Sequence, residues 1–254
     1  MIQQPNYGFP LSSVLIRFLF ALFIPLFVYI LISMNVNLHL IILITLGIVL
    51  IYVFFGVVLF KIHFLNYRMN ILKKMIKIAD LKGNEKILDI GTGAGFLTIG
   101  FAKNLKDGKV TGLDKYSIKY DRFKTQLISY LKINFIGHTL KNAKRNVKIE
   151  NVEDKCEFIQ TDITKPLKFS DSYFDIIISS QFLYCLPPQK RLPVFQEINR
   201  ILKKDGKIIF FESIDFLGWD INHAKNYFEK IGYQIKIIKT IEFQRTCILS
   251  GKKL

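Results

Sequence analysis

The sequence predicts an α/β protein in which a mostly parallel sheet of seven strands, with an antiparallel hairpin at one edge, follows two transmembrane helices. Three observations predict this fold class. After Phe60, short apolar segments alternate with helical segments, which is typical of a parallel sheet covered on both faces. The last two strand-like segments have no helix between them, which favours an antiparallel pair. All but one of the charged residues follow Phe60.

The N-terminal part is almost wholly apolar. Two uncharged or nearly uncharged runs fill it, Leu11–Met34 and Leu40–Phe60. Each is long enough to supply the ~20 helical residues that cross a bilayer core. The short linker Asn35–His39 fits a tight turn between two antiparallel spans. The sequence therefore predicts a transmembrane helical hairpin over residues 1–60 and a separate domain over residues 61–254.

Positive charge lies on one side of these runs. The linker has no Lys or Arg, whereas five basic residues follow the second run, namely Lys61, Arg68, Lys73, Lys74 and Lys77. Because basic flanks stay on the cytoplasmic side, we expect a multi-pass membrane protein with two spans and a cytoplasmic domain. Arg17, near the start of the first run, can snorkel to the same side.

The domain after Phe60 carries 35 basic and 20 acidic residues, a net charge of +15. We attribute most of this charge to codon usage and the part at residues 61–77 to attraction for anionic lipid. We therefore expect the lipid bilayer as a partner and no nucleic acid, because no nucleic-acid-binding motif is present. The three cysteines are far apart, which predicts neither a disulfide framework nor a metal site.

The elements of this domain follow one another in a regular order. A helix with an apolar stripe is predicted from residue 61 to 79, and later helices over 96–105, 139–148, 192–202 and 223–231. Strands are predicted over 86–90, 109–114, 156–160, 174–179, 207–212, 233–239 and 246–250. Glycine-containing turns, such as Lys106-Asp107-Gly108, separate them.

A glycine-rich turn joins the first strand to the helix that follows. Its sequence is Gly91-Thr92-Gly93-Ala94-Gly95. A turn of this kind brings backbone N–H groups and the positive end of a helix beside a ligand. The dinucleotide fingerprint G-x-G-x-x-G would require a glycine at Phe96. The spacing therefore disfavours an NAD-dependent oxidoreductase, which stays open as an alternative.

Three acids accompany this turn. Asp114 ends the second strand, where a carboxylate can accept both hydroxyls of a ribose. Asp89 stands two residues before the first glycine and suits a ligand with a cationic amino group. Asp162 follows the strand over 156–160 and suits an adenine amino group. A nucleoside ligand with an amino-acid part would use all three.

These segments resemble class I S-adenosylmethionine-dependent methyltransferases, which have a Rossmann-like fold. Ile87–Gly95 is similar to motif I of that family, Asp114 to its ribose-binding acid and Thr161-Asp162-Ile163 to its adenine-contacting segment. The segments over 174–180 and 202–209 resemble its fourth strand and the turn into its fifth. The resemblance covers roughly residues 68–254 and does not include the apolar hairpin.

The resemblance implies S-adenosylmethionine as cofactor and methyl transfer to a small-molecule acceptor. The cofactor-binding residues that it implies are Asp89, Gly91, Thr92, Gly93, Gly95, Asp114, Lys115, Asp162, Ile163 and Ser180. The glycine loop would hold the methionyl part, with Asp89 near its amino end. Ser180 and Gln181 would line the mouth near the reactive methyl.

Two departures from the family limit the interpretation. The segment Leu183–Pro187 after the fourth strand has no histidine, so no catalytic residue can be named; Cys185 is read as a buried apolar residue rather than a nucleophile. An extra segment over 116–136 forms either a lid, a membrane-docking helix or an ordinary surface helix. The acceptor is unknown, with a lipid or quinone favoured by the anchor. A non-catalytic cofactor-binding membrane adaptor is a further alternative.

Overall fold

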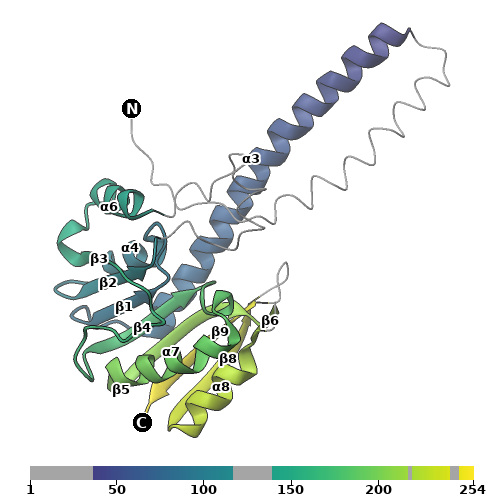
Figure 1. Ribbon diagram of the computed structural model, residues 1–254. Helices are drawn as coiled ribbons and strands as arrows, with labels where there is room; N and C mark the ends of the chain where they lie inside the picture. Colours follow the sequence, from purple (N-terminus) through teal and green to yellow (C-terminus); the bar gives the residue numbers. More distant parts are fainter. Residues whose placement is uncertain (1–36, 117–138, 217–218, 241–245) are drawn as a thin grey trace. The chain divides into compact units, whose positions relative to one another are not determined.

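The computed structural model describes residues 37–116, 139–216, 219–240 and 246–254 (Figure 1). The predicted first span and nearly all of the segment over 116–136 lie outside these residues. The choice between a lid and a membrane-docking helix therefore stays open.

Helix α3 extends from Leu38 to Ala79 and continues through residue 60, where the sequence predicts the domain boundary. Residues 71–254 form one compact unit, and the part of α3 before Ile71 belongs to another. The side chains of residues 51–65 are not among those described. In the described part of the chain, no helix is long and apolar enough to cross a membrane. The two transmembrane helices stay predictions from the sequence.

The main sheet has seven strands in the order β3-β2-β1-β4-β5-β9-β8 (Figure 1). Their bounds are β1 Lys86–Ile90, β2 Lys109–Asp114, β3 Cys156–Gln160, β4 Phe174–Ser180, β5 Leu202–Ser213, β8 Tyr233–Thr240 and β9 Thr246–Lys253. The first five pair in parallel, and β9 is antiparallel to both β5 and β8. The predicted Rossmann-like sheet with an antiparallel edge is confirmed.

Helices cover both faces of this sheet. They are α4 Phe96–Ala102, α6 Leu140–Ile149, α7 Pro188–Ile201 and α8 Ile221–Lys230, with short 3-10 turns at Glu153–Lys155 and Leu183–Cys185. Side chains alternate between the two faces of a strand. Leu88 and Ile90 of β1 therefore join the core formed with α7 and α8, whereas Asp89 between them bonds α4. This two-sided burial explains the apolar strand sequences.

Two local differences from the predicted elements have simple causes. Helix α7 begins at Pro188 rather than 192, because proline is favoured at the first helical position, where its missing N–H costs nothing. Strand β5 begins at Leu202, because Leu202 already pairs with Phe174 before a register shift. Beyond the sheet, β6 Asp215–Phe216 and β7 Trp219–Asp220 form a small ribbon that the sequence did not predict.

The strand order places a topological switch point between β1 and β4. The chain proceeds from β1 outward to β2 and β3, then returns to β4 on the other side of β1. Connections leave these two strands in opposite directions, and open α/β sheets bind ligands beyond the carboxyl ends of the strands at such a point. The glycine loop follows β1 at this point, and Ser180 ends β4.

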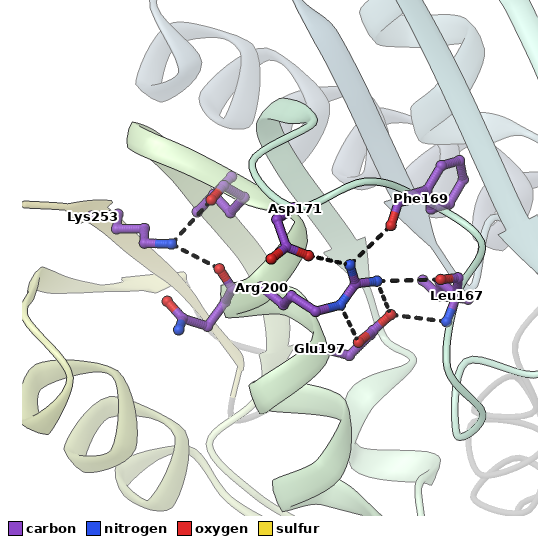
Figure 2. A network of polar contacts seen from close by, with 8 residues as sticks. Leu167, Phe169, Asp171, Glu197, Arg200 and Lys253 are labelled. Carbon is purple, nitrogen blue, oxygen red and sulfur yellow. Dashed lines mark hydrogen bonds and ion pairs between the residues drawn. The ribbon is translucent and has the colours of Figure 1, made fainter.

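Arg200 of α7 secures the connection between β3 and β4 (Figure 2). Its guanidinium donates to both carboxylate oxygens of Glu197, to Asp171 and to the carbonyls of Leu167 and Phe169, over 2.6–3.2 Å. Glu197 in turn accepts the N–H of Leu167 at 2.8 Å. The hydrogen bonds from Arg200 hold the pKa of Glu197 below its ordinary value. The connection secured in this way includes Asp162, near its start.

We expect Arg200→Ala to lower the free energy of unfolding by about 1–2 kcal/mol, because it removes several charge-assisted hydrogen bonds at once. Arg200→Lys should recover little of this stability, because an ammonium group cannot reproduce the planar set of N–H donors of the guanidinium. Thermal denaturation of both variants measures the effect. The control is Lys225→Ala, which removes an exposed pair with Glu229 at 3.9 Å and should change stability by under about 1 kcal/mol. Equal effects of Arg200→Ala and this control would contradict the prediction.

Candidate functional site

The glycine loop has a left-handed backbone conformation that costs other residues conformational energy. Gly91, Gly93 and Gly95 have φ of +74°, +53° and +84°, all in the left-handed region. Gly91 is also closely packed, because a Cβ there would lie 2.2 Å from Cγ of Phe182. The loop after β1 and the segment after β4 are therefore in van der Waals contact across the switch point.

Most N–H groups of the loop already have acceptors within the protein. The N–H groups of Gly91 and Thr92 donate to the carbonyl of Leu113 at 2.8 and 3.0 Å. Gly93 donates to Oδ2 of Asp114 at 2.9 Å, and Gly95 donates to the carbonyl of Thr92. A dinucleotide pyrophosphate would need these donors. The loop thus favours a ligand without phosphate over NAD.

Asp89 lies beneath the loop and is only 1% exposed. Its Oδ2 accepts the backbone N–H and the hydroxyl of Thr98 in the first turn of α4, at 3.1 and 2.8 Å. The Thr98 hydroxyl lies 2.7 Å from that of Thr92. Burial raises the pKa of Asp89 to about 6. Asp89 therefore supports the loop and takes the anion position at the helix end, and its predicted contact with a ligand amino group stays a prediction.

Asp114 ends β2 beside the loop, as predicted. Its two oxygens accept the N–H groups of Gly93 and Tyr116, at 2.9 and 2.8 Å. Each carboxylate oxygen has a second lone pair, so both can also accept a hydroxyl. The Tyr116 hydroxyl is buried nearby and has no partner in the described part of the chain, and burial together with the charge of Asp114 raises the pKa of Tyr116. A paired acceptor beside an unpartnered buried hydroxyl fits a ribose.

Asp162 and Lys115 are brought together at the ends of β3 and β2. Lys115 Nζ lies 2.9 Å from Oδ2 of Asp162, while Oδ1 accepts the N–H and hydroxyl of Thr164. The hydrogen bond from Lys115 is the main reason that the pKa of Asp162 falls to about 2. Ile163 is 6% exposed and packs in the core. A carboxylate that stays ionised is a suitable acceptor for an adenine amino group.

The segment after β4 contains Gln181, which the sequence predicts at the site, and Phe182, which it does not. Gln181 has φ of +54°, and its side-chain Nε2 is buried without a partner among the described residues. Glu212, fully buried at the end of β5, accepts the N–H groups of Phe182 and Leu183 at 3.1 and 3.0 Å. Burial raises the pKa of Glu212 to about 7. Glu212 could have been found from the sequence as an acid near the end of the apolar strand β5, whereas no sequence pattern indicates Phe182.

Cys185 corrects one expectation. It is exposed rather than buried, because it lies on the outer side of the 3-10 turn that follows β4. Among the described residues, no group of three or more His, Cys, Asp or Glu side chains gathers as a metal site would require.

The fold and the site define a class of protein. The carboxyl ends of β1–β3 beside the switch point bring together a ribose acceptor on β2, an ionised acid after β3 and a glycine loop whose donors are largely engaged. This combination is that of an α/β domain for a nucleoside cofactor without phosphates.

Comparisons with known proteins find similarity to methyltransferases. Residues 118–210 match the sequence model of a methyltransferase domain, a range that begins after the glycine loop. A probable methyltransferase from Aspergillus luteorubrus is 26% identical over 136 residues, 53% of this chain and 42% of the relative. A demethylmenaquinone methyltransferase from Lactobacillus johnsonii is 26% identical over 191 residues, 72% of this chain and 69% of the relative.

The crystal structure of an S-adenosylmethionine-dependent methyltransferase from Aquifex aeolicus has the same fold, with a TM-score of 0.53. It is 17% identical, and the match covers 71% of this chain and 88% of that one. The chain spans less than half the length of the first curated relatives that it matches. The described unit has the fold of this methyltransferase, and the sequence matches together with the fold support methyltransferase activity with S-adenosylmethionine as cofactor.

Proposed function

We propose that the whole chain is a membrane-anchored methyltransferase that transfers a methyl group from S-adenosylmethionine to a small acceptor resident in the membrane. The observation that carries the proposal is the site at the switch point, where Asp114 lies against the glycine loop. A reduced quinone is the acceptor class that we favour.

The cofactor supplies an activated methyl group on a positively charged sulfur. Asp114 would bind the ribose hydroxyls and Asp162 the adenine amino group. Gln181, just beyond the end of β4, would orient the acceptor through its amide nitrogen, which has no partner among the described residues. A nucleophilic ring carbon of the acceptor would form the new bond to the methyl carbon as the methyl–sulfur bond breaks, and the ring proton would pass to solvent. Alignment of this kind can provide about 7–11 kcal/mol of the barrier.

The apolar surface of α3 supports the anchor. Large apolar side chains near its start are 38–67% exposed, namely Leu40, Ile42, Leu43, Ile44, Leu46 and Leu50. Keeping apolar surface in water costs about 25 cal/mol per Å². A contiguous stretch of this kind requires a cover, and the uncharged run Leu40–Phe60 with basic residues after it fits a bilayer with the domain on the cytoplasmic side.

Two considerations support a quinone. An anchor at the bilayer brings the site close to lipid-soluble molecules. The relative from Lactobacillus johnsonii, whose match covers 72% of this chain, is named for a demethylmenaquinone substrate. A hydroquinone whose hydroxyl is already ionised needs little further help from a general base, which agrees with the absence of a histidine in the segment Leu183–Pro187.

The test uses the full chain reconstituted in lipid nanodiscs with S-adenosylmethionine labelled in its methyl group. We expect label to enter the lipid extract when a demethylated menaquinone and a reductant are present. Phosphatidylethanolamine nanodiscs without quinone serve as the comparison. Transfer to the lipid alone would replace the quinone by a lipid acceptor.

The alternatives give different results in the same preparation. Binding of NADH, without binding of S-adenosylhomocysteine, would favour an oxidoreductase and contradict the proposal. Binding of S-adenosylhomocysteine with no transfer to any supplied acceptor would favour a cofactor-binding adaptor. Release of the full chain from membranes by alkaline carbonate would contradict the anchor.

A further inference from the structure

Phe182 is the side chain closest to Gly91 across the switch point. Ideal Cβ geometry at Gly91 places that atom 2.2, 2.4 and 2.6 Å from Cγ, Cδ2 and Cβ of Phe182. The ring therefore lies directly on the α-carbon of the first loop glycine. It is partly buried and packs against the core formed with α7 and α8.

The buried carboxylate of Glu212 holds this ring in place. Its Oε1 accepts the Phe182 and Leu183 N–H groups at 3.1 and 3.0 Å and the Ser179 hydroxyl at 3.2 Å. These three donors belong to the end of β4 and the turn after it. Glu212 of β5 thus holds the backbone of Phe182, and Gly91 of the glycine loop contacts its side chain.

The strand order indicates which part of the cofactor would pass this ring. Adjacent strands are about 4.8 Å apart. With adenine at Asp162 beyond β3 and ribose at Asp114 beyond β2, the nucleoside runs toward β1. The sulfur is attached to the ribose through one carbon, so it continues in this direction, toward β1 and β4. Gly91 follows β1 directly, and Phe182 lies on it.

We propose that Phe182 presents its aromatic ring to the sulfonium of S-adenosylmethionine, and so lets the site bind the charged cofactor more tightly than the neutral product. This rests on the proposed function. A ring face attracts a desolvated cation, and a thioether of nearly the same shape lacks that charge. The ring thereby favours exchange of S-adenosylhomocysteine for fresh cofactor after each transfer.

The test is calorimetric titration of the full-length protein in detergent with both ligands. For Phe182→Leu, we expect affinity for S-adenosylmethionine to fall about five- to twentyfold, while affinity for S-adenosylhomocysteine changes less than about threefold. Phe182→Tyr keeps a ring and should retain the preference. Tyr173→Leu, an aromatic substitution at the opposite end of β4, should change neither affinity.

A second measurement keeps the shape of the Phe182 side chain, which the leucine substitution changes. Replacing Phe182 by phenylalanines with increasing ring fluorination weakens the ring face at almost constant shape. Affinity for S-adenosylmethionine should then fall stepwise, and affinity for S-adenosylhomocysteine should not. Equal losses for both ligands, or no loss for S-adenosylmethionine, would overturn the role of Phe182 alone. A wild-type protein that binds neither ligand would overturn the cofactor assignment as well.

Discussion

Replacing Gly91 by alanine is expected to lower the free energy of unfolding by about 2–5 kcal/mol and Tm by roughly 5–15 °C. The left-handed backbone at φ +74° costs an alanine about 1–2 kcal/mol. The added methyl also meets the Phe182 ring at distances of 2.2–2.6 Å, and overpacking of this kind costs about 1–3 kcal/mol. Because the ring must move, cofactor affinity should fall as well. Thermal denaturation and calorimetric titration measure the two effects.

Gly232 provides a matched control. It too has a left-handed backbone, with φ of +92°, but nothing lies within 4 Å of the position that a Cβ would take. Gly232→Ala should therefore cost only about 1–2 kcal/mol and leave cofactor affinity unchanged. In a double-mutant cycle, Phe182→Ala should recover part of the stability lost in Gly91→Ala. Identical losses in the Gly91 and Gly232 variants would show that the contact with Phe182 has no energetic effect.

Asp114→Ala is expected to weaken binding of S-adenosylhomocysteine by roughly ten- to a hundredfold. The substitution removes the acceptor for two ribose hydroxyls, and it leaves the N–H groups of Gly93 and Tyr116 without their carboxylate. Leaving buried donors without an acceptor costs about 1–3 kcal/mol of binding free energy, which corresponds to the expected loss of affinity. Calorimetric titration gives the affinity, and circular dichroism shows whether the fold is retained.

Two variants separate a ribose contact from a general effect of charge. Asp107→Ala removes an equal charge from an exposed turn and should leave the affinity unchanged. Asp114→Asn keeps one acceptor oxygen, so its affinity for S-adenosylhomocysteine should lie between those of the wild type and Asp114→Ala. If Asp114→Ala binds the ligand as the wild type does, Asp114 is a loop carboxylate that only orders Gly93 and Tyr116.

The elements of the sheet were predictable because their signals are local. The strand over 86–90, the glycine turn and the acid at 114 are each visible within about ten residues of sequence, through hydrophobic period, left-handed glycines and a polar strand end. The predicted bounds of β1, β2 and β3 agree with the structure. The start of β5 differs, because Leu202 pairs with Phe174, which is distant in sequence.

The candidate site was predictable only in part. Asp114 and Lys115 follow from the end of β2, but the ion pair between Lys115 and Asp162 depends on β3 lying beside β2. Asp89 is a second example. The sequence places it just before the loop, but only the structure shows that its carboxylate accepts from Thr98 of α4, because alternate residues of β1 face opposite sides of the sheet.

Residue type and short-range spacing were sufficient to predict the alternation of strands and helices, the glycine loop, the three acids near strand ends and the apolar run before the domain. The folded chain was needed to show that β4 returns beside β1, that Phe182 lies on Gly91 and that Glu212 holds the turn after β4. The physical reason is that contacts across a switch point join strands brought together by crossover connections, and no local pattern records which residues will meet there.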